Sequence, residues 1–350
     1  MFSACWNLKH AGSRFRNTYK VGGGNPFVGF WLGRRVFITG ASGFIAPWLA
    51  GELLSRGAEV TALLRPSDEG KTLKLRGILG RVRRVNGDVS QPSSFEALRS
   101  GDFDTCFHLA ARSGVQDGHR FPVKAFEANV VGTLNFLEAC RASKSTERVV
   151  VASSDKVYGE QPKMPCTEDM PLLGSGPYEA SKACAEMLSH SYVRSYGLPI
   201  NVTRCANTYG GGDLSLSRLV PGTIVSILRG ETPVIRSDGK AERDYVYVTD
   251  TVAAYLSLAE KTGKGGICGE AFNFGSGKPV TVLGLFRLIL RTMGSSAEPK
   301  VLNQAGNEIR RQFLDSTKAK RVLGWEPRVT LEKGIHETVA WYAARITELL

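Results

Sequence analysis

Short runs of apolar, β-branched residues alternate with amphipathic stretches along the first 207 residues of the chain. The run at 35–39 stops at Gly40, residues 43–56 carry apolar positions at helical spacing, and residues 59–64 are apolar again. A strand–helix–strand unit of about 30 residues is what a parallel sheet with helical crossovers requires. The alternation continues, with strands expected at 83–86, 105–109, 148–152 and 200–204 and helices at 122–142 and 178–196. The pattern predicts an α/β fold with a Rossmann-type, doubly wound parallel sheet.

The pattern changes after residue 207, starting with the glycine run at 210–212. Helices are expected at about 218–229, 250–260, 281–293, 315–324 and 330–346, with turns and short strands between them. The helix at 281–293 is apolar on most faces, which favours a helix buried in the core. We therefore expect an N-terminal extension at 1–33, a Rossmann domain at 34–207, and a smaller C-terminal α/β cap at 208–350 that is interleaved with the Rossmann domain.

The chain of 350 residues is 42% hydrophobic and carries a net charge of +12. Its length permits a sizeable core. Part of the charge is local, because residues 1–35 contain no acidic residue and six basic ones: Lys9, Arg14, Arg16, Lys20, Arg34 and Arg35. The remainder fits either an ordinary solvated surface or attraction to a polyanionic small molecule such as a nucleotide diphosphate. A nucleic-acid partner is disfavoured, because no basic run is interleaved with aromatic residues.

The seven cysteines are scattered and form no Cys-x-x-Cys pair. This distribution favours reduced thiols in a cytoplasmic protein over disulfides, and it predicts no metal site. No stretch approaches 18 apolar residues, so neither a membrane-spanning helix nor a membrane partner is expected. The basic first 25 or so residues fit an organelle transit peptide or a plain extension equally well.

The loop between the first strand and the first helix carries a glycine pattern. Gly40 permits a tight turn, Gly43 lets the backbone approach a pyrophosphate, and Ala46 stands where a third glycine would only pack helix on strand. The pyrophosphate would rest on the helix N-terminus. The loop therefore predicts dinucleotide binding by Gly40, Ser42, Gly43, Phe44 and Ile45.

The second strand ends at Arg65, where an acidic residue would favour NAD. An arginine can pair with the 2′-phosphate of NADP or merely stack near the adenine, so NAD is expected and NADP is possible. Further residues are expected to line the cofactor at the ends of the third and fourth strands and in the following helix: Asp88, Val89, Leu109, Ala110, Ala111 and Asn129.

Tyr178 and Lys182 stand one helical turn apart on one face of an expected helix. A phenol with a pKa of about 10 is a poor base at neutral pH, and a nearby lysine cation or an oxidised nicotinamide would stabilise its phenolate. Taken alone, the pair fits a surface contact on a helix equally well.

Several motifs occur in a fixed order between about residues 30 and 345. They are TGASGFIA at 39–46, HLAA at 108–111, Asn129 with Gly132-Thr133, VASSDKVYG at 151–159, YEASK at 178–182, RCANTYGGG at 204–212 and RDYVYV at 243–248. Together they resemble the extended short-chain dehydrogenase/reductase family, specifically its NAD-dependent nucleotide-sugar epimerases and dehydratases. The similarity is greatest to CDP-glucose 4,6-dehydratase-like enzymes. Ala41-Ser42 and Arg243-Asp244-Tyr245 depart from that branch, so the nucleotide stays open.

The resemblance implies roles for the matching residues. Ser154 would bind the sugar C4 oxygen, Tyr178 would take the C4 hydroxyl proton as hydride leaves C4, and Lys182 would hold the cofactor ribose. Asp155 and Lys156 match the acid–base pair of 4,6-dehydratases, with Lys156 removing the C5 proton and Asp155 protonating the departing C6 hydroxyl. The alternative is a solvated turn pair. The residues implied for substrate binding are Asn207, which would contact the sugar nucleotide, and Arg218 and Arg243, which could clamp its diphosphate.

These observations predict a nucleotide-diphosphate-sugar 4,6-dehydratase. The same resemblance implies a homodimer. One alternative is a nucleotide-sugar 4-epimerase, which omits the elimination. Another, from a different class, is a non-catalytic dinucleotide-binding scaffold protein, which the presence of Ser154, Tyr178 and Lys182 disfavours.

Overall fold

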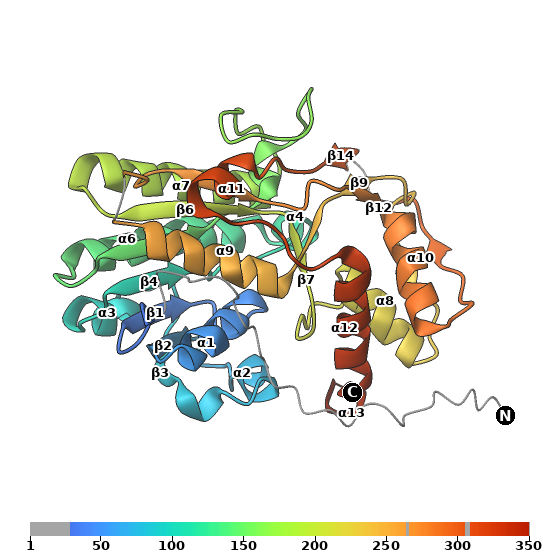
Figure 1. Cartoon of the computed structure of the whole chain (residues 1–350), viewed down its shortest axis with the longest axis horizontal. Coiled ribbons are helices and arrows are strands. Elements are labelled where there is room, and N and C mark those ends of the chain that lie inside the picture. The colour runs from blue at the N-terminus through green and yellow to red at the C-terminus, as the bar shows by residue number, and fades with distance from the viewer. Residues whose placement is uncertain (1–28, 264–265, 305–308, 350) are drawn as a thin grey trace.

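A computed structural model describes residues 29–263, 266–304 and 309–349. The expected extension therefore lies outside the described residues up to position 28. The centre is a seven-stranded parallel sheet in the order β11-β6-β5-β4-β1-β2-β3 (Figure 1). Its strands are β1 (Arg35–Thr39), β2 (Glu59–Leu64), β3 (Arg83–Asn86), β4 (Thr105–His108), β5 (Arg148–Ala152), β6 (Ile200–Cys205) and β11 (Ala271–Phe274). The predicted α/β, Rossmann-type doubly wound sheet is confirmed.

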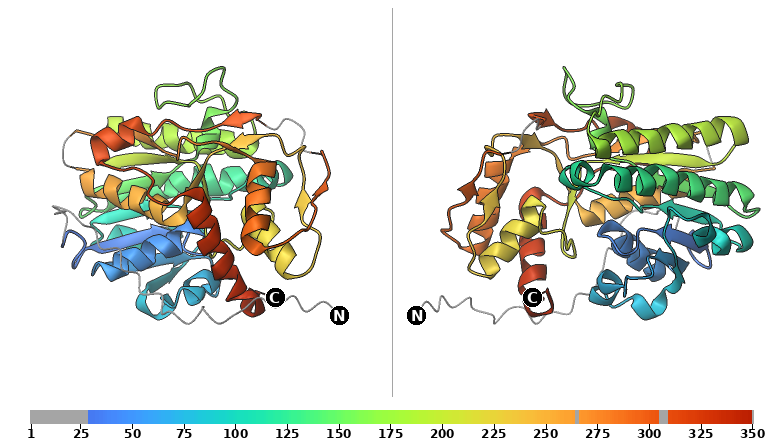
Figure 2. Two further views of the ribbon diagram at one scale, coloured as in Figure 1. Left: turned by 45° about the vertical axis from the view of Figure 1, so that its right-hand side comes forward. Right: turned by 180° about the vertical axis from the view of Figure 1, so that it is seen from behind.

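Helices cover both faces of this sheet (Figures 1 and 2). One face carries α1 (Ile45–Ser55), α9 (Val248–Lys261) and α11 (Thr317–Leu323), and the other carries α3 (Glu96–Ser100), α6 (Gly132–Ala142) and α7 (Pro177–Tyr196). Every residue of β4 is buried, as expected for a parallel strand between two helical layers. β3, at one edge of the sheet, is mostly exposed and carries Arg83 and Arg84.

A smaller α/β part lies beside the carboxyl edge of the sheet (Figure 2). Its helices α8 (Leu219–Leu228), α10 (Val282–Met293) and α12 (Leu331–Ala343) pack around a core that includes Ile224 and Ile289. Its short strands are β7 (Asn207–Tyr209), β8 (Val234–Ile235), β9 (Glu242–Arg243), β10 (Tyr245–Tyr247), β12 (Val280–Thr281), β13 (Lys300–Val301) and β14 (Arg311–Gln312). The expectation of a fully buried helix at 281–293 is wrong. Only Leu285, Phe286 and Ile289 of α10 are buried, because the helix packs with one face on α8 and α12.

The chain crosses between the two parts more than once. After β7 and α8, helix α9 returns to pack against α1, and β11 adds to the large sheet next to β6. Shorter helical segments connect the larger elements: α2 (Lys71–Leu75), η2 (Leu79–Arg81), η3 (Pro92–Phe95), α4 (Val115–Arg120), α5 (Pro122–Phe126), η5 (Asp155–Tyr158) and α13 (Ile346–Leu349). Among the described residues, no helix is long and apolar enough to cross a membrane.

The helix expected at 122–142 is divided by a π-helical turn, η4 (Glu127–Val131), between α5 and α6. Such turns occur where local side-chain contacts outweigh regular helix geometry, and often at functional sites. Here the turn contains Asn129, which is 1% exposed. Hydrophobic periodicity does not register a single wide turn, so the sequence predicts one continuous helix.

Candidate active site

The loop after β1 passes close to the end of β4. Gly40 has φ of +80°, and a Cβ atom there would lie 2.6 Å from the carbonyl carbon of Leu109. Only glycine accommodates both the conformation and the contact. The Gly43 amide donates to the Gly40 carbonyl at 2.9 Å, and α1 follows without a side-chain cap. The N–H groups of the first turn of α1 are therefore available to phosphate oxygens.

A buried hydrogen-bond chain fixes the end of β4 beside this loop. The Ala110 amide donates to Thr39 Oγ1 at 3.1 Å, and Thr39 Oγ1 lies 2.9 Å from His108 Nδ1. His108 Nε2 lies 3.1 Å from Thr133 Oγ1. Burial lowers the pKa of His108 to about 3, so the ring is neutral and acts as a structural link. These hydrogen bonds place Leu109, Ala110 and Ala111 along the expected cofactor path.

The other predicted cofactor residues lie along the same edge of the sheet. Arg65 is exposed immediately after β2. Asp88 follows β3, and its Oδ1 accepts hydrogen bonds from the Ser90 amide at 2.9 Å and the Ser90 hydroxyl at 2.7 Å. Val89 packs on Gly132, where a Cβ would lie 2.7 Å from Val89 Cγ2.

Asn129 uses its side chain within the protein. Its Oδ1 accepts from the Arg112 amide at 2.7 Å, and its Nδ2 donates to Ser181 Oγ at 2.8 Å and to the Arg112 carbonyl at 3.2 Å. These bonds tie the loop after β4 to α7, three residues from Tyr178. Asn129 thus holds the walls of the site together.

Ser154, Tyr178 and Lys182 meet where β5 ends against α7. Ser154 caps η5, and its Oγ accepts from the Lys156 amide at 3.2 Å. Burial raises the pKa of Tyr178, and a hydrogen bond with Ser154 partly offsets this. Lys182 Nζ donates to the Ala152 carbonyl, and burial lowers the Lys182 pKa to about 8 against the opposing charge of Glu186. The expectation that Lys182 and an oxidised nicotinamide stabilise the Tyr178 phenolate stays a prediction, because burial dominates the Tyr178 pKa in the protein without cofactor.

Asp155 and Lys156 form a buried ion pair next to Ser154. Lys156 Nζ lies 2.8 Å from Asp155 Oδ2, and the two side chains are 14% and 3% exposed, respectively. Ser154 Oγ donates to Asp155 Oδ1 at 3.1 Å. Lys156 Nζ also donates to Gln312 Oε1 at 2.6 Å. The alternative of a solvated turn pair is therefore wrong.

The three predicted substrate residues lie on the smaller part of the protein. Asn207 Nδ2 donates to the Asp244 carbonyl at 2.9 Å. Arg218 pairs with Asp213 at 2.9 Å and reaches Ser113 Oγ, in the loop after β4, at 3.0 Å. Arg243 is 8% exposed on β9, and its Nη1 donates to the Glu242 carbonyl at 2.9 Å. Arg218 thus connects the smaller part of the protein to the loop after β4, whereas Arg243 is more buried.

Comparison with known proteins gives a match to the GDP-mannose 4,6 dehydratase family model over residues 37–338. The chain belongs to this family. It is 32% identical to a UDP-glucose 4-epimerase of Mycolicibacterium smegmatis, covering 88% of the chain and 98% of that protein. It is also 32% identical to a dTDP-glucose 4,6-dehydratase of Xanthomonas campestris, covering 89% of the chain and 93% of that protein.

Solved structures agree with this assignment. A dTDP-glucose 4,6-dehydratase from Bacillus anthracis, in complex with NAD, matches with a TM-score of 0.80 and 27% identity over 91% of the chain and 100% of that protein. The predicted family of nucleotide-sugar dehydratases and epimerases is thus confirmed, and with it the expectation of an enzyme.

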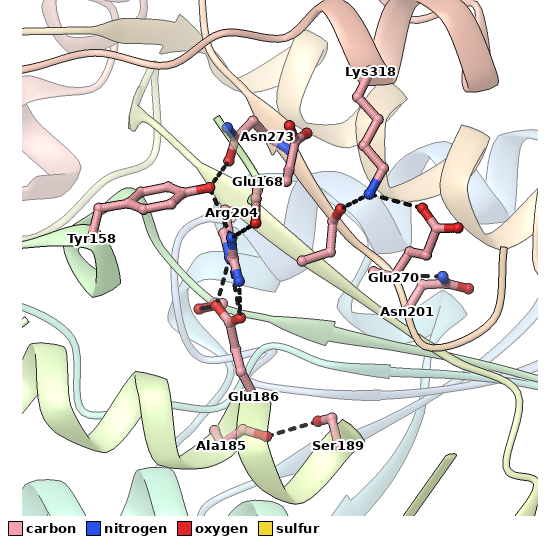
Figure 3. Close-up of polar contacts among 12 residues, drawn as sticks. Tyr158, Glu168, Ala185, Glu186, Ser189, Asn201, Arg204, Glu270, Asn273 and Lys318 are labelled. Atoms are coloured by element: carbon pink, nitrogen blue, oxygen red, sulfur yellow. Dashed lines mark hydrogen bonds and ion pairs between the residues drawn. The ribbon is translucent and has the colours of Figure 1, made fainter. Parts of the chain in front are cut away.

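In this member of the dehydratase family, a buried polar network is centred on Arg204 and Glu186 (Figure 3). Arg204 on β6 donates to Glu186 through Nε at 3.1 Å and Nη2 at 2.7 Å. Its Nη1 donates to Tyr158 Oη at 2.8 Å, and Tyr158 donates to Asn273 Oδ1 at 2.7 Å. Ser153 Oγ donates to the same Glu186 carboxylate. The network therefore joins β5, η5, α7, β6 and β11.

Two catalytic candidates neighbour this network in the sequence. Glu186 lies one helical turn after Lys182, and Ser153 precedes Ser154. Sequence reasoning missed Glu186, Tyr158 and Gln312, because their partners are far away in the chain. The sequence signals for the first two were their positions: Tyr158 lies within the VASSDKVYG motif at 151–159, and Glu186 follows the YEASK motif at 178–182.

We expect Glu186→Gln to lower the free energy of unfolding by about 3–5 kcal/mol, because it leaves the buried Arg204 charge without its counter-ion. Denaturant titration of the variant and the parent measures this. Glu326→Gln is the matched control, since its pair with Lys320 at 2.8 Å is more than half exposed and should contribute little. Equal stability of Glu186→Gln and the parent would contradict the structural role of the network.

Proposed function

We propose that the chain is a nucleotide-diphosphate-sugar 4,6-dehydratase that uses bound NAD. The buried Asp155–Lys156 pair beside Ser154 and Tyr178 is the observation that carries this proposal. Some relatives are named dehydratases and others 4-epimerases, and relatives of both kinds are similarly identical in sequence to this chain. Overall similarity therefore does not separate the two activities, whereas an acid–base pair inside the site is needed for elimination alone.

The redox half of the reaction uses Tyr178, Ser154 and Lys182. Bound NAD would supply the hydride acceptor for oxidation at C4 and the hydride donor for reduction at C6. The Gly40 turn and the uncapped first turn of α1 fit its pyrophosphate. Tyr178 takes the C4 hydroxyl proton, Ser154 orients that hydroxyl, and Lys182 contacts the cofactor ribose. Asn207, Arg218 and Arg243 would hold the sugar nucleotide.

The elimination half uses the ion pair. A single proton shift across the 2.8 Å contact converts lysine ammonium and aspartate into a neutral amine and a carboxylic acid. The 4-keto group acidifies the C5 hydrogen, which Lys156 removes, while Asp155 protonates the C6 hydroxyl that leaves as water. Return of hydride to C6 and of the proton from Lys156 to C5 completes a 4-keto-6-deoxy product. Solvent exchange moves the remaining proton from Tyr178 to Asp155.

Incubation with a panel of nucleotide-diphosphate sugars tests the proposal. Mass spectrometry of the products should show loss of one water from one of them. If the products are instead C4 epimers of unchanged mass, the 4-epimerase alternative takes its place. If sugar nucleotides and NAD bind without any product, the chain is a scaffold protein and the catalytic assignment falls.

We expect Arg65 to permit NADP binding in addition to NAD, because its guanidinium can pair with a 2′-phosphate. Calorimetric titration of the cofactor-free protein with NAD and NADP measures both affinities. Arg65→Asp should weaken NADP strongly and leave NAD nearly unchanged, since like charges repel the 2′-phosphate. Lys71→Asp, a charge reversal at an exposed position six residues away, is the control. A parent that strongly prefers NAD, with no shift in Arg65→Asp, would show that Arg65 does not read the ribose.

Residues 34–207, which supply six of the seven strands of the large sheet, are proposed to bind the cofactor, and residues 208–350, which also supply β11, are proposed to make most contacts with the substrate nucleotide. We also propose a homodimer through α5–α6 and α7, which pack together and expose apolar side chains. These are Val123, Phe126, Val131, Leu134 and Met187.

Six cysteines lie in the described part of the chain and none is in a disulfide, which supports a reducing compartment such as the cytoplasm.

A further inference from the structure

Gln312 is fully buried at the end of β14, 156 residues away from the pair that it contacts. Its Oε1 accepts from Lys156 Nζ at 2.6 Å, and its Nε2 donates to the Asp155 backbone carbonyl at 2.9 Å. The Gln312 side-chain amide therefore forms hydrogen bonds with two consecutive residues of η5, Asp155 and Lys156. A buried amide with every bond directed at one neighbouring segment determines where that segment lies.

The two acceptors around Lys156 have a specific consequence for a base. A neutral amine has two N–H bonds and one lone pair in a tetrahedral arrangement. Once the acid proton of Asp155 is turned toward the C6 hydroxyl, Asp155 Oδ2 at 2.8 Å and Gln312 Oε1 at 2.6 Å can each accept one N–H. Because the Cε–Nζ bond is also fixed, the two acceptors together set the direction of the lone pair. One acceptor alone would let the lone pair and the second N–H exchange places.

We propose that Gln312 is a positioning residue that aims the Lys156 lone pair at the C5 hydrogen of the substrate. The proposal rests on the function proposed above, in which Lys156 is the C5 base. Gln312 itself transfers no proton. It acts through Lys156 and through the Asp155 carbonyl, and it has no part in oxidation at C4.

The position of β14 does not depend on this side chain. The Asp244 amide donates to the Gln312 carbonyl at 3.2 Å, and the Cys166 amide donates to the Phe313 carbonyl at 2.9 Å. Asp244 Oδ2 also accepts from the Leu314 amide at 3.3 Å. These backbone contacts fix the strand, so the Gln312 amide is left for the ion pair.

The test separates C5 chemistry from C4 chemistry in Gln312→Met, which preserves the side-chain volume and removes both hydrogen bonds. Exchange of the C5 hydrogen with deuterated solvent and loss of water should fall about 10- to 100-fold, as for a small misplacement of a catalytic group. Transient reduction of the cofactor, followed by near-ultraviolet absorbance, should keep the parent rate. The reduced cofactor should therefore accumulate in the variant.

Gln161→Met is the matched control. Gln161 is also buried and donates to the Tyr158 and Pro171 carbonyls at 2.6 Å and 2.8 Å, close to η5, but it does not touch Lys156. It should leave the ratio of C5 exchange to C4 oxidation unchanged. Gln312→Asn serves if the Met variant does not fold, because its shorter amide stays polar but cannot reach both partners.

Each outcome decides the matter. If the parent releases water and a folded Gln312 variant exchanges C5 at the parent rate, the role of Gln312 is wrong and the dehydratase function stands. If C4 oxidation falls in step with C5 exchange, Gln312 is only structural. A parent that never releases water overturns the dehydratase function, and the positioning role with it.

Discussion

Tyr178→Phe is expected to lower turnover about 10²- to 10⁴-fold while cofactor affinity stays nearly unchanged. The phenol oxygen accepts the C4 proton, and general acid–base catalysis contributes on this scale. The ring alone packs at the start of α7, and Phe keeps it. Mass-spectrometric product assays and calorimetric titration with NAD measure the two quantities.

Tyr196→Phe provides the control, because Tyr196 ends the same helix and is 57% exposed. It should match the parent in both assays. Turnover of Tyr178→Phe close to the parent rate would show that another group takes the C4 proton.

Lys156→Ala is expected to separate oxidation from elimination. The variant should still reduce its cofactor transiently when substrate is added, because Ser154, Tyr178 and Lys182 are unchanged. Exchange of the C5 hydrogen with deuterated solvent and release of water should fall by about two to four orders of magnitude, since the variant lacks the amine proposed to remove that hydrogen. Near-ultraviolet absorbance and mass spectrometry follow the two halves separately.

Lys163→Ala controls for the loss of a positive charge near η5, because Lys163 is exposed and follows that segment. It should leave both halves intact. If Lys156→Ala still releases water at the parent rate, the base is a different residue and the ion pair has another purpose.

Local sequence patterns were sufficient for the sheet and for the catalytic helix. The strand predictions at 35–39, 59–64 and 148–152 agree with β1, β2 and β5, because strands buried on both faces leave a nearly continuous apolar run. The prediction at 83–86 agrees with β3, although this edge strand is mostly exposed. The role of Gly40 could also be predicted from local sequence, since few residues other than glycine permit a tight turn between a strand and a helix.

Properties that depend on distant partners were not predictable in the same way. The sequence fits Asp155-Lys156 either as an acid–base pair or as a solvated turn pair, and only the packing of β14 over η5 shows that Asp155 is buried and Lys156 largely covered. The apolar composition of α10 predicted a buried helix. Only one face of α10 is covered, however, because α8 and α12 are the helices that pack against it. The pKa of Tyr178 also follows from burial, which no spacing of Tyr178 and Lys182 encodes.

The late position of β14 has a consequence for how the enzyme is made. A ribosome delivers the chain from its N-terminus, and domains generally fold as they emerge. Strands β1 to β6 and the Tyr178–Lys182 helix are complete by residue 205, whereas Gln312 emerges more than 100 residues later. A nascent chain can thus form most of the dinucleotide-binding sheet before Gln312 is present to orient Lys156. The amine proposed to perform the elimination is therefore among the last groups to be set in place, and a chain that ends before β14 would lack the Gln312 contact to it.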